Sequence, residues 1–223
     1  MRFVFLIGGF VFSCEETIEL LKRYGNLIRR LHSEKNKIWV VAGGGRTART
    51  YIKLAKALGA SNALLDEIGI MASRLNAYLL ISCIGEIAHP IVPSSLDQVK
   101  ALSDDRVVVV GGMFPGQSTD AVGSIIAEYF NVDYLFKFSG VKGVYRRYPP
   151  GPDEPILSRI TYNELMKILS SKRFDPGTYE LFDPVALRII SRSNIKLVFL
   201  DGKAPELLYQ YLSGCAVGTE VVP

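Results

Sequence analysis

Cysteine and histidine are scarce in this chain of 223 residues, which has three Cys and two His. Cys14, Cys83 and Cys215 lie far apart and form no CxxC pair, and neither His32 nor His89 completes a group with metal-ligand spacing. This spacing excludes a disulfide framework and the familiar zinc sites. We expect reduced thiols in the protein core, as is usual for free cysteine in a cytoplasmic protein.

Long hydrophobic runs and a strong excess of one charge are also missing. No segment reaches about 18 uninterrupted apolar residues, so none predicts a membrane span. The apolar start, Met1–Phe12, lacks a small-x-small cleavage site and leads directly into Glu15 and Glu16, which favours a buried first strand over a signal peptide. The net charge of +4 is too small for a nucleic-acid-binding face but suits a protein that handles small anions.

The short motifs of several large enzyme classes are absent as well. There is no GxxxxGK(S/T) motif, and Gly43–Ala48 does not fit GxGxxG, so neither a P-loop nor a dinucleotide-binding fingerprint is present. The chain has no His-Glu-x-x-His and no Gly-x-Ser-x-Gly. Zinc proteases and serine hydrolases therefore lack support.

What the sequence does contain is a series of short apolar runs separated by stretches with helical periodicity. In Arg49–Leu58, apolar side chains recur every three to four residues, and Gly59 follows as a C-cap. Continuous apolar strands that alternate with helices indicate a parallel sheet covered on both faces. The predicted fold class is α/β, as one domain over residues 1–223. The predicted strands are Phe3–Ile7, Ile38–Ala42, Val107–Val110, Tyr134–Phe138 and Lys196–Leu200.

Glycine follows each predicted strand. Ligands of open parallel sheets bind beyond the carboxyl ends of the strands, and glycine lets backbone N–H groups approach a phosphate closely. The helix that comes next adds its positive N-terminal end. The pattern predicts an anion-binding edge. The glycines are Gly8 and Gly9, Gly43–Gly45, Gly111 and Gly112, Gly140 and Gly143, and Gly202.

Two arginines follow the second glycine run. Arg46 and Arg49 are three residues apart, so a helix that begins at this loop would present them on one face. Guanidinium groups bind phosphate through paired hydrogen bonds. Cations at a helix N-terminus oppose the helix dipole, and a bound anion would relieve that cost. The pair therefore predicts a phosphate-binding site.

The third glycine run leads into two hydroxyl residues, and two carboxylates elsewhere in the chain also fit more than one role. Ser118 and Thr119 are N-cap candidates for a helix that extends to Tyr129, and their hydroxyls could also bind phosphate or base edges. Asp66 could accept hydrogen bonds from ribose hydroxyls, but it also fits a plain surface position. Asp183, which precedes a proline, fits a helix N-cap.

These segments resemble the archaeal-type UMP kinases of the amino-acid kinase superfamily, and the resemblance covers essentially the whole chain. It implies a three-layer αβα sandwich around a mostly parallel sheet, and Mg²⁺-dependent transfer of phosphate from ATP to UMP in pyrimidine biosynthesis. It also implies a cytoplasmic homohexamer, a trimer of dimers. UMP would occupy about residues 1–130 and ATP about residues 131–223. The similar segments are Ile7–Gly9, Val41–Tyr51, Asp66–Ala77, Gly111–Val122, Gly143–Tyr145 and Gly177–Pro184.

The resemblance also assigns roles to single residues. Asp183 would help to organise the reacting groups, and Arg46 is the first candidate for the cation that neutralises the transferring phosphoryl group. No protein ligand for a metal is implied. The residues expected to bind UMP are Gly44, Asp66, Phe114, Pro115, Gly116, Gln117, Ser118, Thr119 and Asp120. The residues expected to bind ATP are Gly8, Gly9, Gly45, Arg49, Ser139 and Tyr145.

The chain departs from the family pattern mainly on the ATP side. Many members carry a Lys in the first strand, where this chain has Phe5–Ile7. The nucleotide segment has Lys142 at a position that is usually acidic, and Tyr148 three residues beyond the motif tyrosine, where an Asp is usual. Phosphoryl transfer needs charge neutralisation, so a basic side chain at Arg46, Lys137 or Lys142 could replace the missing cation.

A further departure is Phe10, which stands after the first glycines in place of a small hydroxyl residue. Two alternatives to an active kinase stay open on the sequence. One is a relative that binds UMP without phosphorylating it, and the other is a member that stores oxyanions such as molybdate or tungstate. Fold-level similarity does not choose among the three, because unrelated functions share folds.

Overall fold

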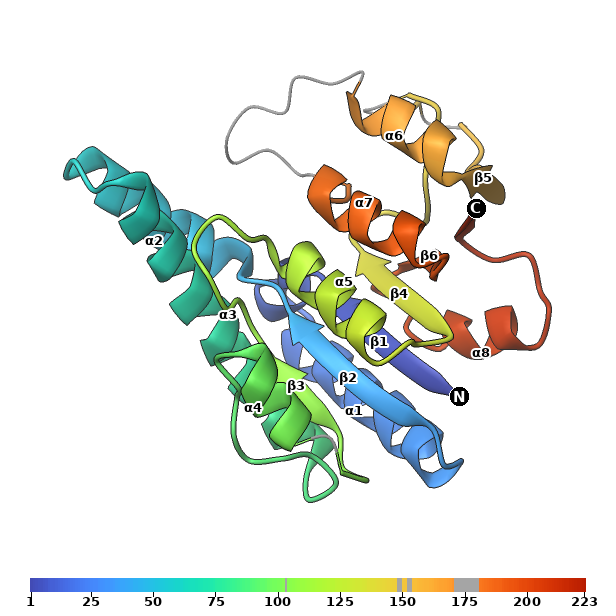
Figure 1. Cartoon of the computed structure of the whole chain (residues 1–223), viewed down its shortest axis with the longest axis horizontal. Helices are drawn as coiled ribbons and strands as arrows, with labels where there is room; N and C mark the ends of the chain where they lie inside the picture. Colours follow the sequence, from blue (N-terminus) through green and yellow to red (C-terminus); the bar gives the residue numbers. More distant parts are fainter. Residues whose placement is uncertain (103, 148–149, 152–153, 171–180) are drawn as a thin grey trace.

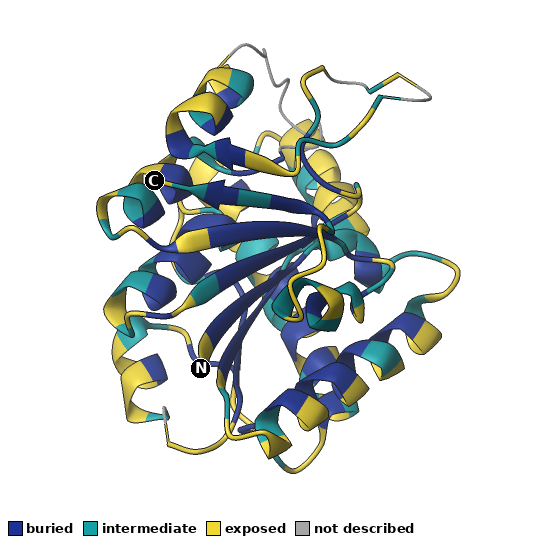
Figure 2. Ribbon diagram, turned by 90° about the vertical axis from the view of Figure 1, so that its right-hand side faces the viewer, coloured by how far each residue is buried: buried dark blue, intermediate teal, exposed yellow. Residues whose placement is uncertain are grey.

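A seven-stranded sheet forms the centre of the molecule (Figures 1 and 2). The computed structural model describes residues 1–102, 104–147, 150–151, 154–170 and 181–223. The strands in chain order are β1 (Arg2–Ile7), β2 (Lys37–Ala42), β3 (Val108–Val110), β4 (Tyr134–Ser139), β5 (Arg159–Thr161), β6 (Lys196–Asp201) and β7 (Thr219–Val222).

The strand order is β3-β2-β1-β4-β6-β7-β5, and each neighbouring pair is parallel except β6 and β7, which are antiparallel. The register places Leu6 of β1 directly opposite Lys137 of β4. Because paired residues point to the same face of a sheet, these two side chains share one face. Because β1, β2, β3, β4 and β6 run parallel to one another, their carboxyl ends lie at the same edge of the sheet.

Helices cover both faces of the sheet, which makes the three layers visible in Figure 2. One layer holds α5 and α7, and the other holds α1, α3 and α8, while α2 packs on α3. The helices are η1 (Gly9–Phe12), α1 (Thr17–Ser33), α2 (Gly45–Ala57), α3 (Asn62–Ile84), α4 (Leu96–Ala101), α5 (Thr119–Tyr129), α6 (Tyr162–Ser170), α7 (Pro184–Arg192) and α8 (Leu207–Leu212).

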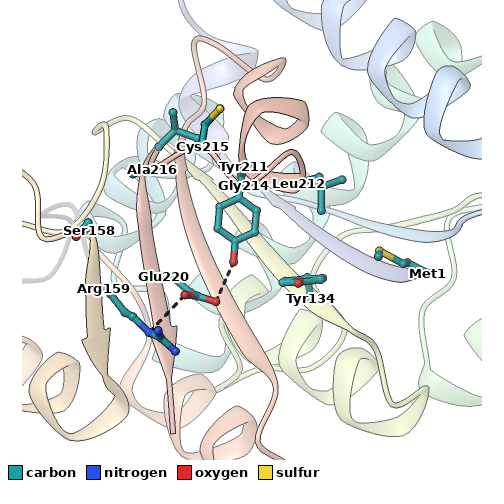
Figure 3. A pocket seen from close by; sticks show the side chains of 11 residues that line it. Met1, Tyr134, Ser158, Arg159, Tyr211, Leu212, Gly214, Cys215, Ala216 and Glu220 are labelled. Carbon is teal, nitrogen blue, oxygen red and sulfur yellow. Dashed lines mark hydrogen bonds and ion pairs between the residues drawn. The ribbon is translucent and has the colours of Figure 1, made fainter.

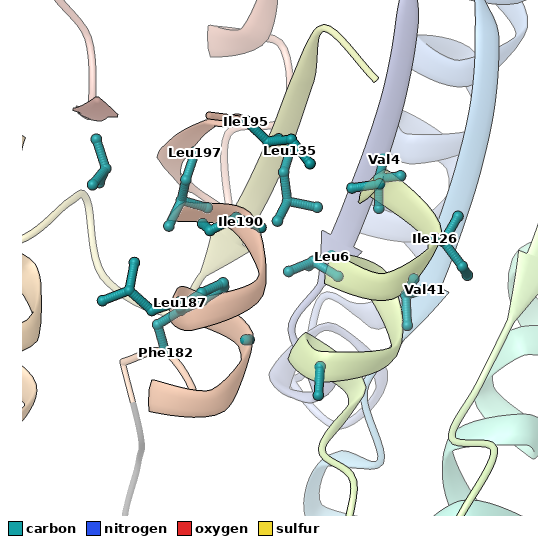
Figure 4. Close-up of a cluster of buried hydrophobic side chains, with 14 of the residues drawn as sticks. Val4, Leu6, Val41, Ile126, Leu135, Phe182, Leu187, Ile190, Ile195 and Leu197 are labelled. Carbon is teal, nitrogen blue, oxygen red and sulfur yellow. The ribbon is translucent and has the colours of Figure 1, made fainter. Parts of the chain in front are cut away.

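Each face of the sheet has its own hydrophobic core, because side chains alternate along every strand. On the α5–α7 face, Leu6 and Leu135 pack with Ile126 and Leu187, as Figure 4 shows. The aromatic residues of β1 and β4 at alternate positions point to the opposite face and pack against α1 and α3. The two-sided burial explains why these strands read as continuous apolar runs.

The five predicted strands are confirmed, and one end of each differs by a single residue. Strands β5 and β7 were not predicted. They are three and four residues long and lie at the far edge of the sheet, so neither carries a long apolar run. The α/β class and the mostly parallel sheet are also confirmed.

The expectation of core thiols is wrong for Cys215, which is exposed in the segment between α8 and β7. Cys14 and Cys83 are half-buried and pack against the core on the α1–α3 face of the sheet, and all three cysteines are free. The absence of a disulfide among these residues agrees with the sequence interpretation.

The apolar stripe predicted at Arg49–Leu58 is helical, but it does not face a core. Tyr51, Leu54 and Leu58 are 59–89% exposed, and the buried residue of α2 is Ala48. The adjacent helix α3 is long and apolar enough to cross a membrane by length and composition, yet only a third of its most apolar stretch is buried. Its exposed apolar side chains are Leu64, Met71, Leu75, Tyr78 and Leu79. We call these eight exposed residues of α2 and α3 the α2–α3 apolar surface.

Candidate active site

Three glycine-rich loops follow β1, β2 and β3, and we call them the β1 loop (Gly8–Gly9), the β2 loop (Gly43–Gly45) and the β3 loop (Gly111–Gln117). The first two touch directly. A Cβ on Gly9 would lie 2.1 Å from the Gly45 amide nitrogen, and a Cβ on Gly43 would lie 2.7 Å from the Gly9 nitrogen. Side chains have no room between these backbones, so glycine is required there.

The β2 loop turns directly into α2. Gly45 has φ +65°, a conformation that favours glycine, and Gly44 is the N-cap residue. No acidic side chain lies in the first turn of α2, and Arg46 and Arg49 are both exposed there. The predicted helix start and the shared face of the two arginines are therefore confirmed. The arrangement combines a helix N-terminus with two guanidinium groups, which suits an anion.

Helix α3 holds two of the glycine loops in place. Asn76 donates from Nδ2 to the carbonyl oxygens of Gly43 and Gly44, at 2.7 and 3.2 Å. Ser73 accepts a 2.7 Å hydrogen bond at Oγ from the Gly112 amide. Both side chains are buried, at 4% and 1% exposure. One face of α3 thus fixes the spacing between the β2 and β3 loops.

The β3 loop is held from the same helix. Asp66 is exposed, and its Oδ2 accepts a 2.8 Å hydrogen bond from the Gly116 amide, where the backbone has φ +79°. The side chains of Phe114, Pro115 and Gln117 are exposed around this contact. The structure therefore joins two of the segments predicted to bind UMP, although they are about 50 residues apart.

The N-termini of α5 and α7 meet beside the β3 loop. Ser118 is the N-cap of α5 and accepts from the Ala121 amide at 3.0 Å, as predicted. Asp183 is the N-cap of α7 and accepts from the Val185 amide at 2.7 Å, which confirms the helix-cap interpretation. The Ser118 hydroxyl also donates to the second carboxylate oxygen of Asp183. The two helix starts are therefore linked through capping side chains.

Beneath the first turn of α5 lies a buried ion pair. Asp120, which is 7% exposed, accepts a hydrogen bond from the Lys137 ammonium of β4, which is 9% exposed. Thr119 is half-buried at the helix start. Asp120 thus differs from the exposed part of the β3 loop, because its carboxylate points into the protein rather than toward solvent.

The end of β4 lies against the β1 loop. The Gly8 amide donates to the Phe138 carbonyl at 3.0 Å, and the Ser139 hydroxyl, which is buried, donates to the Val141 carbonyl at 2.8 Å. Tyr145 is half-buried in the following segment, and Lys142 is exposed. The predicted ATP residues of β1 and β4 are therefore adjacent. The part of the predicted motif at Gly177–Glu180 lies outside the described residues, as does Tyr148.

Phe10, the residue that departs from the family pattern, covers the same edge. Its ring carbons lie 3.0 Å from the position that a Cβ on Gly8 would take, 2.5 Å from that of Gly202 and 3.8 Å from that of Gly140. The ring therefore packs over the ends of β1, β4 and β6. Substitution by a small hydroxyl residue would open this surface.

A cavity of about 660 Å³ lies between α2 and α3, and Arg49 and Asp66 are among its lining residues. The family resemblance assigned these two residues to different nucleotides, but the structure places both beside one cavity. Ser73 was missed as a candidate site residue, whereas Lys137 was named on the sequence as one of three candidates for the missing cation. The available signal for Ser73 was its position three residues before Asn76, which puts both on one helix face.

Another cavity, of about 470 Å³, lies at the opposite end of the strands (Figure 3). Its lining includes Tyr134 at the start of β4 and Tyr211, which donates to Glu220 at 3.0 Å. Burial and the nearby Glu220 carboxylate raise the pKa of Tyr211 well above its usual value. Arg159 also pairs with Glu220, at 3.5 Å. These groups satisfy one another, and none of the glycine loops reaches this cavity.

Within the described residues, no group of three or more His, Cys, Asp or Glu side chains could hold a metal ion. Mg²⁺ usually takes one or two carboxylates, several waters and the phosphate oxygens of a substrate. The described residues of the site therefore fit magnesium that arrives with a nucleotide.

Comparisons with known proteins agree on one family. The Amino acid kinase family profile matches residues 1–201. A uridylate kinase of Methanothermobacter thermautotrophicus is 41% identical over 225 residues, which is 100% of both chains. The crystal structure of uridylate kinase from Archaeoglobus fulgidus has a TM-score of 0.87 and 38% sequence identity, and it too covers 100% of both chains. A UMP kinase from Bacillus anthracis, with a TM-score of 0.80 at 19% identity, shares the fold; the match covers 99% of this chain and 95% of that one.

Proposed function

The chain belongs to the amino acid kinase family, and on that premise we propose that it is a uridylate kinase, which transfers the γ-phosphoryl group of ATP to UMP and forms UDP in pyrimidine nucleotide biosynthesis. The observation that carries the proposal is the meeting of the β1 and β2 loops at the carboxyl edge of the sheet, with no side chain between them. Backbone amides and a helix N-terminus gather there, as binding of phosphate groups requires.

We place the acceptor in the part formed by about residues 1–130. Asp66 and the β3 loop support this placement, because the carboxylate holds the loop and its exposed second oxygen can accept a ribose hydroxyl. Phe114 is 57% exposed and offers an aromatic face to the uracil base. Gly44 and the α5 N-terminus, from Ser118 to Asp120, complete the proposed UMP site.

We place ATP in the part formed by about residues 131–223, together with the β1 and β2 loops. Gly9 and Gly45 would approach its phosphates through their amides, and Gly8, whose amide donates to the Phe138 carbonyl, would leave room for them because it has no side chain. Ser139 and Tyr145 lie at the end of β4 and on the segment that follows it. Mg²⁺ bound with the nucleotide would supply positive charge that neutralises part of the phosphate charge. The described residues offer no carboxylate cluster that would hold this ion without the nucleotide.

Positioning and charge supply most of the catalysis in phosphoryl transfer. Arg46 and Arg49 lie exposed on the first turns of α2, where each guanidinium can donate two hydrogen bonds to phosphate oxygens. Arg46 follows the β2 loop directly and is assigned to the transferring group. Asp183 would act indirectly on the reacting groups. Its carboxylate caps α7 and accepts a hydrogen bond from Ser118, and it thereby fixes the start of α5.

We also propose that the protein is a cytoplasmic homohexamer built as a trimer of dimers. The α2–α3 apolar surface supports self-association, because its eight large apolar side chains lie exposed on two helices that pack on each other, and exposed apolar groups of this size often mark an interface. Light scattering tests it: Leu75→Glu, in the centre of the surface, should lower the molar mass. Ile18→Glu, which changes an even more exposed aliphatic residue of α1, should not.

The decisive experiment is to titrate UMP and ATP separately by calorimetry and then to assay UDP formation with UMP, CMP and dUMP. UDP from UMP with ATP and Mg²⁺ supports the proposal. Binding of UMP without any UDP would instead indicate a non-catalytic relative. Failure to bind UMP, together with binding of molybdate or tungstate, would indicate a storage protein.

A further inference from the structure

A lysine occupies an unusual place on β4. Lys137 is 9% exposed, and Leu135, Phe136 and Phe138 around it on the strand are all fully buried. Lysine is almost never buried unless it is paired. Here the partner is Asp120 of the first turn of α5, which is itself 7% exposed.

The ion pair lies next to the end of β1. The register sets Lys137 opposite Leu6, two residues before Gly8, and the side chains share the α5–α7 face of the sheet. One residue further along β4, the Phe138 carbonyl accepts from the Gly8 amide. The Lys137 ammonium therefore lies at the N-terminus of α5, the helix that packs on β1 and β4 (Figure 1).

Stability does not account for this arrangement. Replacing a buried ion pair by well-packed apolar residues is often neutral or stabilising, because both charges lose their hydration. The other contact of the Lys137 ammonium in the described part of the chain is the Phe182 ring, whose centroid is 6.0 Å away. An ammonium has three N–H donors, and the single carboxylate contact leaves two of them for another acceptor.

We propose that Lys137 is a catalytic residue whose ammonium contacts the transferring phosphoryl group, while Asp120 is the positioning residue that holds it. The inference rests on the proposed kinase function. In the reaction, an oxygen of the UMP phosphate forms a bond to the γ-phosphorus, and the bond from that phosphorus to the β,γ-bridging oxygen breaks. The electron pair remains on the β-phosphate of ADP. The attacking oxygen is already anionic, so Lys137 supplies charge and hydrogen bonds and no proton.

Burial makes Lys137 more effective for this role than the exposed cations nearby. Arg46 and Lys142 are exposed to solvent, where water screens their charge. A fixed ammonium in a site of low dielectric interacts more strongly with charge that develops in the transition state, and it needs little reorganisation. Arg46 can then bind the phosphates of ATP from the solvent-exposed side, while Lys137 contacts the γ-phosphoryl group from β4.

The test compares the parent with Lys137→Met and with a double variant, Lys137→Leu with Leu6→Lys, which moves the cation to the paired position on β1. Lys196→Met is the matched control, because it removes a lysine from the opposite end of the neighbouring strand. Melting curves verify folding. The measurements are kcat, the KM for UMP, and the Kd values of ATP and ADP.

Lys137→Met should lower kcat by about 100-fold or more, the scale for loss of one transition-state donor. ATP should bind at least about tenfold more weakly and ADP almost unchanged, since a charged hydrogen bond to the γ-phosphoryl is lost. The double variant should recover part of kcat, and it replaces Lys137→Met if that chain does not fold. Lys196→Met should match the parent.

Parent kcat and parent ATP affinity in folded Lys137→Met would overturn the assignment. So would equal weakening of ATP and ADP, or a folded double variant that is no more active than Lys137→Met, because each result gives Lys137 a structural role. If the parent forms no UDP, the proposed function fails. The affinities for ATP and ADP then still decide whether Lys137 contacts the γ-phosphoryl group.

Discussion

Substitution of Ser73 by alanine tests whether α3 positions the β3 loop. The Ser73 hydroxyl is 1% exposed; it accepts from the Gly112 amide at 2.7 Å and donates to the Ile70 carbonyl at 2.7 Å. Ser73→Ala leaves the buried Gly112 N–H without this acceptor, which costs about 1–3 kcal/mol. The better helix propensity of alanine offsets at most about 0.7 kcal/mol. The net loss should therefore be about 0.3–3 kcal/mol.

The chain offers a matched control on the same helix. Ser82 is exposed, and its hydroxyl donates to the Tyr78 carbonyl one turn earlier. Ser82→Ala makes the same chemical change without leaving a buried donor, so its melting temperature should stay within the small range of surface substitutions. For a domain of this size, 1 kcal/mol corresponds to about 2–4 °C in melting temperature.

Calorimetric melting and UMP kinetics read out the two consequences of Ser73→Ala. The melting temperature should fall by several degrees relative to Ser82→Ala, and the KM for UMP should rise because the β3 loop is no longer fixed. Equal melting temperatures for the two variants would refute the reasoning, since they would show that the Gly112 amide finds another partner at no cost. A lower melting temperature with parent KM would separate stability from loop positioning.

Three further substitutions follow from the structure. Asp66→Asn should weaken UMP binding by calorimetry, by about 1.5–3 kcal/mol if a charged hydrogen bond is lost; parent affinity would make Asp66 a surface residue. Gly9→Ala should abolish UDP formation in a folded protein, because its Cβ would lie 2.1 Å from the Gly45 nitrogen; near-parent activity would show that the loops can separate. Glu128 has its pKa lowered, chiefly by the hydrogen bond from Arg192, so it stabilises the fold above its unfolded pKa and loses this contribution as pH falls through the lower folded value. Glu128→Gln should therefore cost less than about 1 kcal/mol at pH 7 and nothing in strong acid, and a cost independent of pH would argue against the ion pair.

Local signals in the sequence were sufficient for the strands, the glycine loops and the helix caps. Apolar runs bounded by glycine predicted β1, β2, β3, β4 and β6, because burial on both faces leaves no polar alternation. Ser118 and Asp183 were recognised as caps, since a cap depends on a contact with an amide only two or three residues away. Local signals did not predict β5 and β7, because each has only three or four residues and forms a strand through pairing with neighbouring strands.

Sequence periodicity also predicted which residues of a helix share a face, but not what that face contacts. The stripe of Tyr51, Leu54 and Leu58 is helical and yet exposed, because α2 packs on α3 and the one residue that it buries is Ala48. An amphipathic pattern is a property of one helix, whereas burial depends on the neighbour that the helix meets. Only the tertiary structure showed that this surface is left open in one chain.

The pairing of Lys137 with Asp120 was decided by the tertiary structure in the same way. The sequence alone showed that the first strand lacks a lysine and that Lys137 lies on the strand leading to a glycine. It could not show that β1 and β4 are neighbours, because parallel strands about 130 residues apart carry no local mark of their partner. Register then places Lys137 opposite Leu6, and the packing of α5 on that face brings Asp120 to it. The position of the Lys137 charge thus depends on contacts between segments that are distant in the sequence. The glycines at the carboxyl edge of the sheet could be predicted locally, because each loop needs a backbone without a side chain.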